Sequence, residues 1–149
     1  MGRMAYGKVG MNDIEVLIDS DAFVGLMLEQ DAHHERVVRI FDNLKAHTIP
    51  LATTSFVVAE TATVLSHMSG QALARTFLDE VVTQSGLPVI FIDESLYNDA
   101  VAIFHNVGKR GSSITDCANV AVIRRFEIPQ IFSFDKVYRT EFHIPMTQA

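Results

Sequence analysis

The chain has 149 residues, 48% of them apolar, which is enough for one domain with a buried core and too few for two. Its 18 acidic and 12 basic residues give a formal charge of −6, which is unfavourable for a protein that binds nucleic acid through clustered cations. A single cysteine excludes an internal disulfide, and charges interrupt every apolar run, so we expect a cytoplasmic protein without a membrane span.

Residues 1–13 contain no apolar segment of the kind found in signal peptides. We expect a disordered lead-in or a cloning remnant there, and a folded domain over 14–149. The first predicted element is a buried strand at 14–18 (IEVLI). A helix is predicted over 34–45, where apolar residues recur at helical spacing, and a second strand at 51–52.

Two further helices are predicted, each with an apolar face and each ended by a glycine. Their apolar positions are Val57, Thr61, Val64, Leu65 and Met68 before Gly70, and Leu73, Phe77, Leu78 and Val81 before Gly86. These stripes supply more apolar surface than one sheet face needs, so we predict a homodimer.

The last third of the chain continues the alternation. A third strand is predicted at 88–92, a helix opened by Asp93, a loop at 108–113, a helix from Ile114 and a last strand within 128–134. Alternating strands and helices predict an α/β fold, a single-domain three-layer α/β/α sandwich with a mainly parallel sheet. Ligands in such folds bind beyond the carboxyl ends of the strands.

Four acidic residues are placed to reach that edge of the sheet. Asp19 and Asp135 directly follow the first and last predicted strands, Asp116 lies in the first turn of a helix, and Glu60 interrupts an apolar helix. No Lys or Arg lies near Asp19 or Glu60 in the sequence, so converging carboxylates would repel one another. A hard divalent cation such as Mg²⁺ removes that repulsion, and such ions support phosphodiester cleavage.

Each acid also has a structural interpretation. Asp19 and Asp135 could be helix N-caps, Asp116 fits a capping box with Ser113, and Glu60 could accept a hydrogen bond from a core hydroxyl. Asp93 also follows a strand, and we interpret it as an N-cap. Position after a strand is therefore a weak signal by itself.

The order and context of the four acids resemble the PIN-domain nucleases, particularly the toxin ribonucleases of VapBC toxin–antitoxin pairs. The stretches that carry the resemblance are VLIDSDAFVGL, DAHHERV, TTSFVVAETATVL, SSITDCANVAVIRR and IFSFDKVYRTEF. The resemblance covers roughly residues 14–144, and its specificity lies in the four acidic motifs occurring together in this order.

The resemblance implies a PIN-like nuclease domain whose catalytic and metal-binding quartet is Asp19, Glu60, Asp116 and Asp135. It implies Mg²⁺ or Mn²⁺ as the cofactor, RNA as the substrate, and a homodimer. Ser133 matches the family's hydroxyl position and supports the quartet. Asp21 stands where many relatives carry Asn, Ser or Thr, and we interpret it as a helix N-cap rather than an outer acid.

The remaining polar residues give weaker signals. The six histidines show no zinc-binding spacing. Lys109, Arg110, Arg124 and Arg125 are candidates for RNA phosphate contacts, although cations near helix C-termini also favour the helix dipole. A carboxylate cleft attracts a guanidinium, so a small antitoxin protein could block the site with an Arg.

Two other function classes fit parts of the sequence. Asp19 and Asp21 resemble the paired acids of haloacid-dehalogenase-like phosphatases, and Asp93 with Lys136 could serve a receiver-like phosphoacceptor. Both lack the remaining motifs of their class. A PIN module that binds RNA or protein without cleaving it is the non-enzymatic alternative, because a fold does not fix a function.

Overall fold

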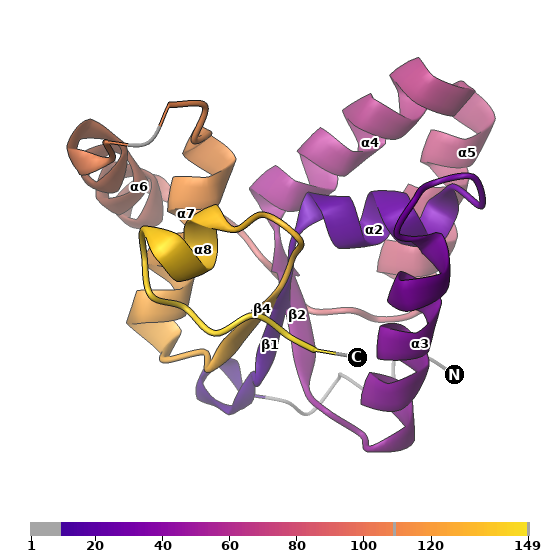
Figure 1. Ribbon diagram of the computed structural model, residues 1–149, viewed down its shortest axis with the longest axis horizontal. Coiled ribbons are helices and arrows are strands. Elements are labelled where there is room, and N and C mark those ends of the chain that lie inside the picture. Colours follow the sequence, from indigo (N-terminus) through magenta and orange to yellow (C-terminus); the bar gives the residue numbers. More distant parts are fainter. Residues whose placement is uncertain (1–9, 109, 149) are drawn as a thin grey trace.

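The computed structural model describes residues 10–108 and 110–148. A four-stranded parallel sheet in the order β3-β2-β1-β4 forms the middle layer (Figure 1). Its strands are β1 (Val16–Ile18), β2 (Leu51–Thr54), β3 (Val89–Ile90) and β4 (Gln130–Phe132). The predicted parallel α/β architecture is confirmed.

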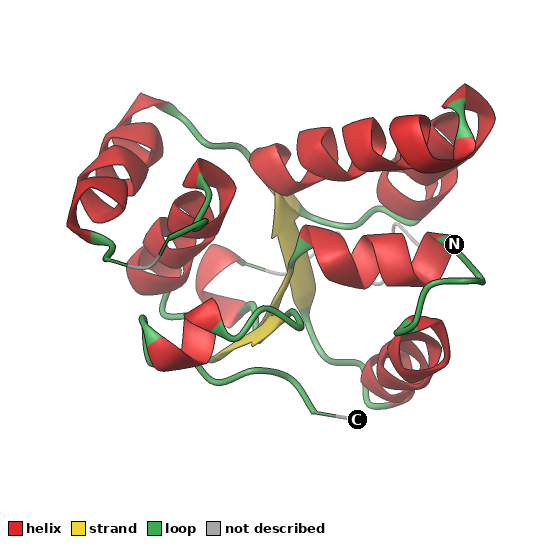
Figure 2. Ribbon diagram, turned by 45° about the horizontal axis from the view of Figure 1, so that its top comes forward, coloured by secondary structure: helices red, strands yellow, loops and turns green. Residues whose placement is uncertain are grey.

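Helices cover both faces of the sheet (Figures 1 and 2). One side carries α2 (Ser20–Met27), α3 (His34–Ala46), α4 (Ser55–Ser69), α5 (Gln71–Thr76) and the π-helical η2 (Phe77–Gln84). The other side carries α6 (Glu94–Asn106), α7 (Ile114–Phe126) and α8 (Val137–Thr140). The result is the predicted three-layer sandwich.

The central strand shows why the sheet is covered twice. Val16 and Ile18 pack into the core formed by α2 to α5, whereas Leu17 packs into the core formed by α6 to α8. All three are at most 2% exposed, so no strand face is left to water. Successive side chains of a strand point to opposite faces, and here both faces are apolar.

Helix boundaries follow local capping. Thr54 caps α4 by accepting a hydrogen bond from the backbone N–H of Val57 at 3.2 Å, and Gly70 ends it with φ at 90°. Asp93 caps α6 by accepting from the N–H of Leu96 at 2.9 Å, as predicted. Such caps satisfy amide groups that have no partner within the helix.

Two elements differ from the sequence prediction. The helix predicted through Leu73 and Val81 is present, but it is α-helical only over α5 and continues from Phe77 as the π-helical η2. The short helix α8 had no periodic signal, since four residues are too few to show one. The chain after α8 returns to β4, where Ile131 pairs with Met146.

Residues 1–9, most of the expected disordered lead-in, lie outside the described residues. A 3₁₀ turn, η1 (Met11–Asp13), precedes the domain proper. Over 10–108 and 110–148, none of the helices has the length and apolar character needed to cross a membrane.

Candidate active site

Asp19 and Ser133 meet because β1 and β4 are neighbours. The pairing of Ile18 with Phe132 continues one step further, where the N–H of Asp19 donates to the carbonyl of Phe132 at 3.0 Å. The hydroxyl of Ser133 then donates to Asp19 Oδ2 at 2.9 Å. The first and last strands thus place both residues at the carboxyl edge of the sheet, as predicted for Asp19.

Asp19 is a buried carboxylate surrounded by neutral donors. It is 4% exposed, and its Oδ1 accepts from the N–H of Ser20 at 2.8 Å and from Asn119 Nδ2 at 3.1 Å. The first of these contacts makes Asp19 the N-cap of α2. Burial, the charge of Asp21 and, more weakly, that of Asp116 raise the pKa of Asp19 to about 7 against the opposing hydrogen bonds.

Glu60 reaches the same edge from α4. Its Oε2 accepts a 2.6 Å hydrogen bond from the hydroxyl of Ser20, the residue that follows Asp19. The sequence had suggested a core hydroxyl as an alternative role for Glu60. The hydroxyl that it meets belongs to the site and connects Glu60 to the Asp19 segment.

Asp116 and Asp135 approach from the other side of the sheet. Asp116 forms the predicted capping box with Ser113, and its Oδ1 also accepts from the hydroxyl of Tyr138 at 3.0 Å. Asp135 is exposed, and its Oδ1 accepts from the N–H of Val137 at 2.9 Å. The N–H of Asp135 donates to Ser133 Oγ at 3.1 Å. Capping and a place at the sheet edge therefore coexist in Asp116, whereas Asp135 is not the N-cap of α8, which begins after Lys136.

Asp21 does not cap a helix, so the N-cap interpretation is wrong. It lies inside α2, where its Oδ2 accepts from the N–H of Phe134 at 2.8 Å and lies 3.2 Å from the hydroxyl oxygen of Ser133, whose single hydrogen has the shorter contact with Asp19. Its other oxygen, Oδ1, is buried and has no hydrogen-bond partner. Burial is the main cause of a raised pKa for Asp21. A fifth carboxylate therefore borders the site.

Asn119 and Tyr138 connect two of the acids, and sequence analysis did not single them out. Asn119 is completely buried, and its Nδ2 donates to Asp19 at 3.1 Å and to the Tyr138 hydroxyl at 3.0 Å. The hydroxyl donates onward to Asp116. The detectable signal was a lone amide on the apolar stripe of α7, since buried polar groups need partners.

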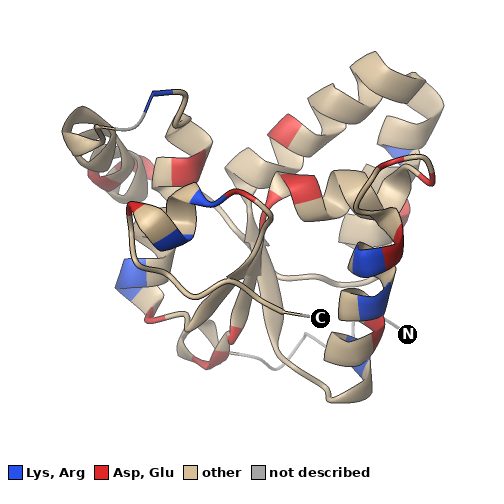
Figure 3. Ribbon diagram, in the orientation of Figure 1, with Lys and Arg blue, Asp and Glu red and all other residues tan. Residues whose placement is uncertain are grey.

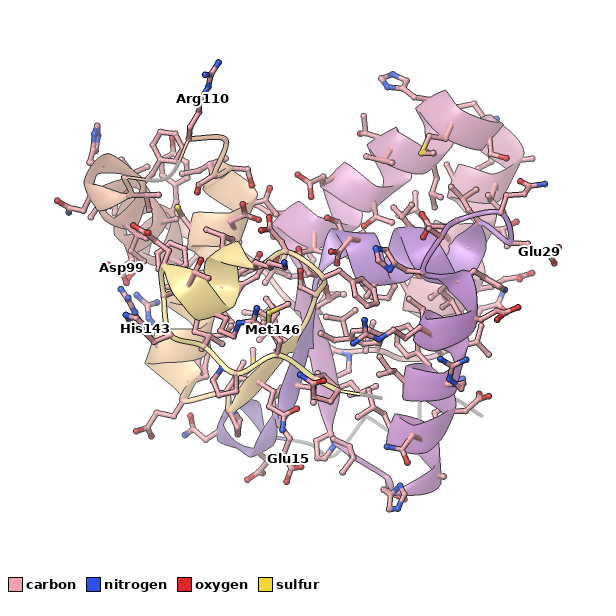
Figure 4. The ribbon with its side chains drawn as sticks, in the orientation of Figure 1. Glu15, Glu29, Asp99, Arg110, His143 and Met146 are labelled. Atoms are coloured by element: carbon pink, nitrogen blue, oxygen red, sulfur yellow. The ribbon has the colours of Figure 1, made fainter. Side chains whose placement is uncertain are left out.

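The predicted RNA-contacting cations do not gather at the site. Arg124 and Arg125 lie in the last turn of α7, about 12 Å along the helix from Asp116. Arg125 pairs with Asp99 at 2.7 Å, and Arg110 projects away from the molecule (Figure 4). Lys109 lies outside the described residues. Figure 3 shows acidic segments of α2, α4, α7 and the loop after β4 around the same end of the sheet.

The donor set fits a hard divalent cation. The four quartet residues and Asp21 offer carboxylate oxygens only, and Asp21 Oδ1 is a buried acceptor without a partner. Within the described ranges, no three His, Cys, Asp or Glu side chains form a ready-made metal cluster. Mg²⁺ does not require one, because it keeps several waters and often uses only one or two carboxylates.

Comparison with known proteins gives one family and several similar folds. The PIN domain family model matches residues 16–140. VapC20 of Mycobacterium tuberculosis, described as a sarcin–ricin loop cleaving toxin, gives a TM-score of 0.74 at 22% identity, covering 85% of this chain and 95% of that chain.

Two more solved structures share the fold. FitAcB from Neisseria gonorrhoeae gives a TM-score of 0.64 at 15% identity, covering 89% of this chain and 96% of that chain. VapBC2 from Rickettsia felis, solved with a DNA fragment from its promoter, gives a TM-score of 0.65 at 12% identity. The match covers 90% of this chain and 98% of that chain. Among curated protein sequences, no match is found.

Proposed function

Because the chain belongs to the PIN-domain family, we propose that it is a metal-dependent endoribonuclease that hydrolyses RNA phosphodiester bonds. The observation that carries the proposal is Asp19, a buried carboxylate at the sheet edge with neutral donors and a pKa raised to about 7. A protein keeps such a group at a cost to its stability. Titratable groups with strongly shifted pKa values cluster at active sites.

The quartet would hold Mg²⁺ or Mn²⁺, which supplies an activated water and charge stabilisation for the leaving oxygen. The protein's contribution is orientation. Ser133 and Asn119 hold both oxygens of Asp19, Ser20 holds Glu60, and Tyr138 holds Asp116. The N–H of Val137 holds Asp135 through Oδ1.

We also propose that the enzyme is the toxin of a VapBC-type pair, active in the cytoplasm and controlled by a small antitoxin. Support comes from the similarity in fold to VapC20, a toxin that cleaves the sarcin–ricin loop, and to VapBC2, a pair solved on promoter DNA. An antitoxin Arg inserted among the acids would supply the cation that the site lacks and exclude metal.

The cleavage test uses the purified chain and end-labelled single-stranded RNA with Mg²⁺ or Mn²⁺. We expect cleavage that stops in excess EDTA and falls by orders of magnitude in Asp116→Asn. Asp99→Asn is the matched control, because Asp99 is exposed and pairs with Arg125 away from the site. Cleavage by Asp116→Asn at the wild-type rate, or cleavage in EDTA, would refute the nuclease assignment.

The toxin test is expression in a heterologous host, alone and together with the adjacent small gene. We expect growth arrest that the neighbour relieves and that Asp116→Asn abolishes. Normal growth with high levels of active, unpartnered enzyme would instead indicate a housekeeping RNA-processing nuclease. The two tests are separate, so the nuclease proposal survives failure of the toxin proposal.

A further inference from the structure

A stack of three side chains borders the acidic site. Phe134 lies between Ser133 and Asp135, and its N–H donates to Asp21 at 2.8 Å. The ring of His33 lies parallel to the Phe134 ring, with centroids 4.0 Å apart and an angle of 5° between the planes. The guanidinium carbon of Arg36 lies 5.2 Å from the centroid of Phe134. We call these three residues the stacking triad.

The triad is held in place from both ends. The N–H of His33 donates to Asp31 Oδ1 at 2.8 Å, and the imidazole of His34 contacts the carbonyl of Gly25 at 2.7 Å, which anchors the start of α3 on α2. Phe134 is anchored by its bond to Asp21. The side chains of His33 and Arg36 are exposed. The ring of His33 rests on Phe134 and belongs to an exposed residue, so it is preorganised for contact with a planar ligand.

The triad also adds positive charge at the border of an acidic site. The chain carries a formal charge of −6, and the predicted cations on α7 lie away from the acids. Arg36, with the exposed Arg39 one turn further along α3, provides positive charge beside the site, visible as blue segments on α3 in Figure 3. Aromatic rings and guanidinium planes are the surfaces on which unpaired nucleobases stack.

We propose that the stacking triad is a nucleobase-binding subsite, an inference that rests on the proposed ribonuclease function. An unpaired base next to the scissile phosphate stacks on His33, and Arg36 contacts the adjoining phosphate. A neutral base is not repelled by the carboxylates, so stacking gives an acidic protein affinity for RNA that phosphate contacts alone would not. This subsite also favours single-stranded over duplex RNA, because a base within a duplex is already stacked.

The experiment pairs protein variants with abasic RNA. A single abasic nucleotide is moved along an oligonucleotide, and each substrate is tested with wild type, His33→Ala and His33→Phe. We expect one position at which the abasic substitution raises KM about tenfold in wild type. His33→Ala should raise the KM of intact RNA by a similar factor and show no further loss at that position. His33→Phe should restore most of the affinity, because it keeps an aromatic surface.

His47→Ala is the matched control, since His47 is an exposed histidine at the other end of α3. The same series is read as binding by fluorescence anisotropy with Asp116→Asn, which separates this inference from the proposed activity. The loss of affinity caused by His33→Ala could instead add in full to the loss caused by the abasic nucleotide at every position. That result would overturn the subsite and leave the nuclease assignment intact. Unchanged RNA binding with a weakened antitoxin complex would assign the triad to a protein partner and also overturn it.

Discussion

At the residue scale, the neutral side chains of Asn119 and Tyr138 orient the carboxylates of the site. Asn119 donates to Asp19 and to Tyr138, and because an amide nitrogen is only a donor, the tyrosine hydroxyl is left to donate to Asp116. This chain of bonds fixes the direction of two carboxylates that belong to different elements. Removing the tyrosine hydroxyl should therefore affect the orientation of both acids.

We predict that Tyr138→Phe lowers RNA cleavage by about 10- to 100-fold, in the range found when residues that orient metal ligands are removed. The ring is completely buried and stays in place, so only the hydroxyl bridge is lost. The metal concentration for half-maximal cleavage should rise, which a purely structural role would not cause. Tyr97→Phe, at an exposed tyrosine of α6, is the control. An unchanged metal titration would show that the bridge does not orient Asp116.

The raised pKa of Asp19 predicts how stability varies with pH in metal-free protein. The folded state keeps the proton up to about pH 7, whereas the unfolded chain releases it near the ordinary value of 3.8. The folded state therefore binds more protons between these values, and the free energy of unfolding falls as pH rises through that window. Urea denaturation in EDTA should show lower stability at about pH 8 than at about pH 5.

Asp19→Asn should remove much of this slope and raise the stability at the higher pH, because an amide does not ionise. Asp99→Asn, outside the site, should keep the wild-type slope. A profile that is equally steep in Asp19→Asn would assign the pH dependence to other groups. The raised pKa of Asp21 acts in the same direction, so a residual slope of the same sign is expected.

Sequence information was sufficient for some of these residues and insufficient for others. Asp19 follows a strand and Ser113 precedes Asp116 by three positions, which are local patterns. The bond between Ser133 and Asp19 spans 114 positions, and that between Asn119 and Asp19 spans 100. Partners so far apart leave no local pattern. Asp21 was misassigned because a cap and a buried acid look alike at the start of a helix.

At the element scale, the contact of α2 with α3 positions both the acids and the stacking triad. Gly25 makes it close, since a Cβ there would lie 2.8 Å from Val37 Cγ2. Val37 is completely buried and β-branched, so it has little freedom to move aside. The glycine is required by packing, because its backbone is ordinary helix.

We predict that Gly25→Ala destabilises the fold. Overpacking costs about 1–3 kcal/mol. That exceeds the gain of up to about 1 kcal/mol that alanine brings to a helix. Urea denaturation measures the difference in the free energy of unfolding. Gly25→Ala should cost less stability in a Val37→Ala background than in wild type, because the methyl group that a Cβ would meet is then absent. Gly108→Ala, where nothing lies within 4 Å, is the control. A Gly25→Ala protein more stable than wild type would mean that α2 moves freely.

The order of the longer elements was predictable because their helices have a clear periodicity, and α4, α6 and α7 also have side-chain caps. The strand bounds were less accurate: 14–18 and 88–92 are too long for Val16–Ile18 and Val89–Ile90, and 51–52 is too short for Leu51–Thr54. Pairing ends where the neighbouring strand ends, which depends on the whole sheet. The π-helical geometry of η2, which packs against α4 and α5, is not revealed by residue spacing.

At the scale of the whole molecule, we predict a homodimer. Val57, Leu65 and Phe77 of the apolar stripes do not supply the interface, because they are completely buried within one chain. Of the exposed apolar residues, Phe91 (74% exposed) and Leu78 (37% exposed) line a groove between α4 and η2. A second copy covering this groove would remove both from water.

Light scattering at high micromolar concentration should give the mass of two chains. Phe91→Glu should shift the protein towards monomer without loss of fold, because the side chain makes little contact within one chain. Met68→Glu, at another exposed apolar residue, serves as the control for added charge. A monomer mass for wild type would reject the dimer.

The adjacency of β1 and β4 has a consequence for the time at which the site comes into being. Ribosomes synthesise a chain from its N-terminus, so Asp19 emerges long before Ser133, Asp135 and Tyr138, which follow it by 114 positions or more. Closing so long a loop comes late, after the local helices have formed. A nascent or truncated chain that ends before β4 holds Asp19, Glu60 and Asp116 but lacks Ser133, Asp135 and Tyr138, which complete the hydrogen bonds of the site. The complete acidic cluster therefore exists only after β4 and α8 have been synthesised.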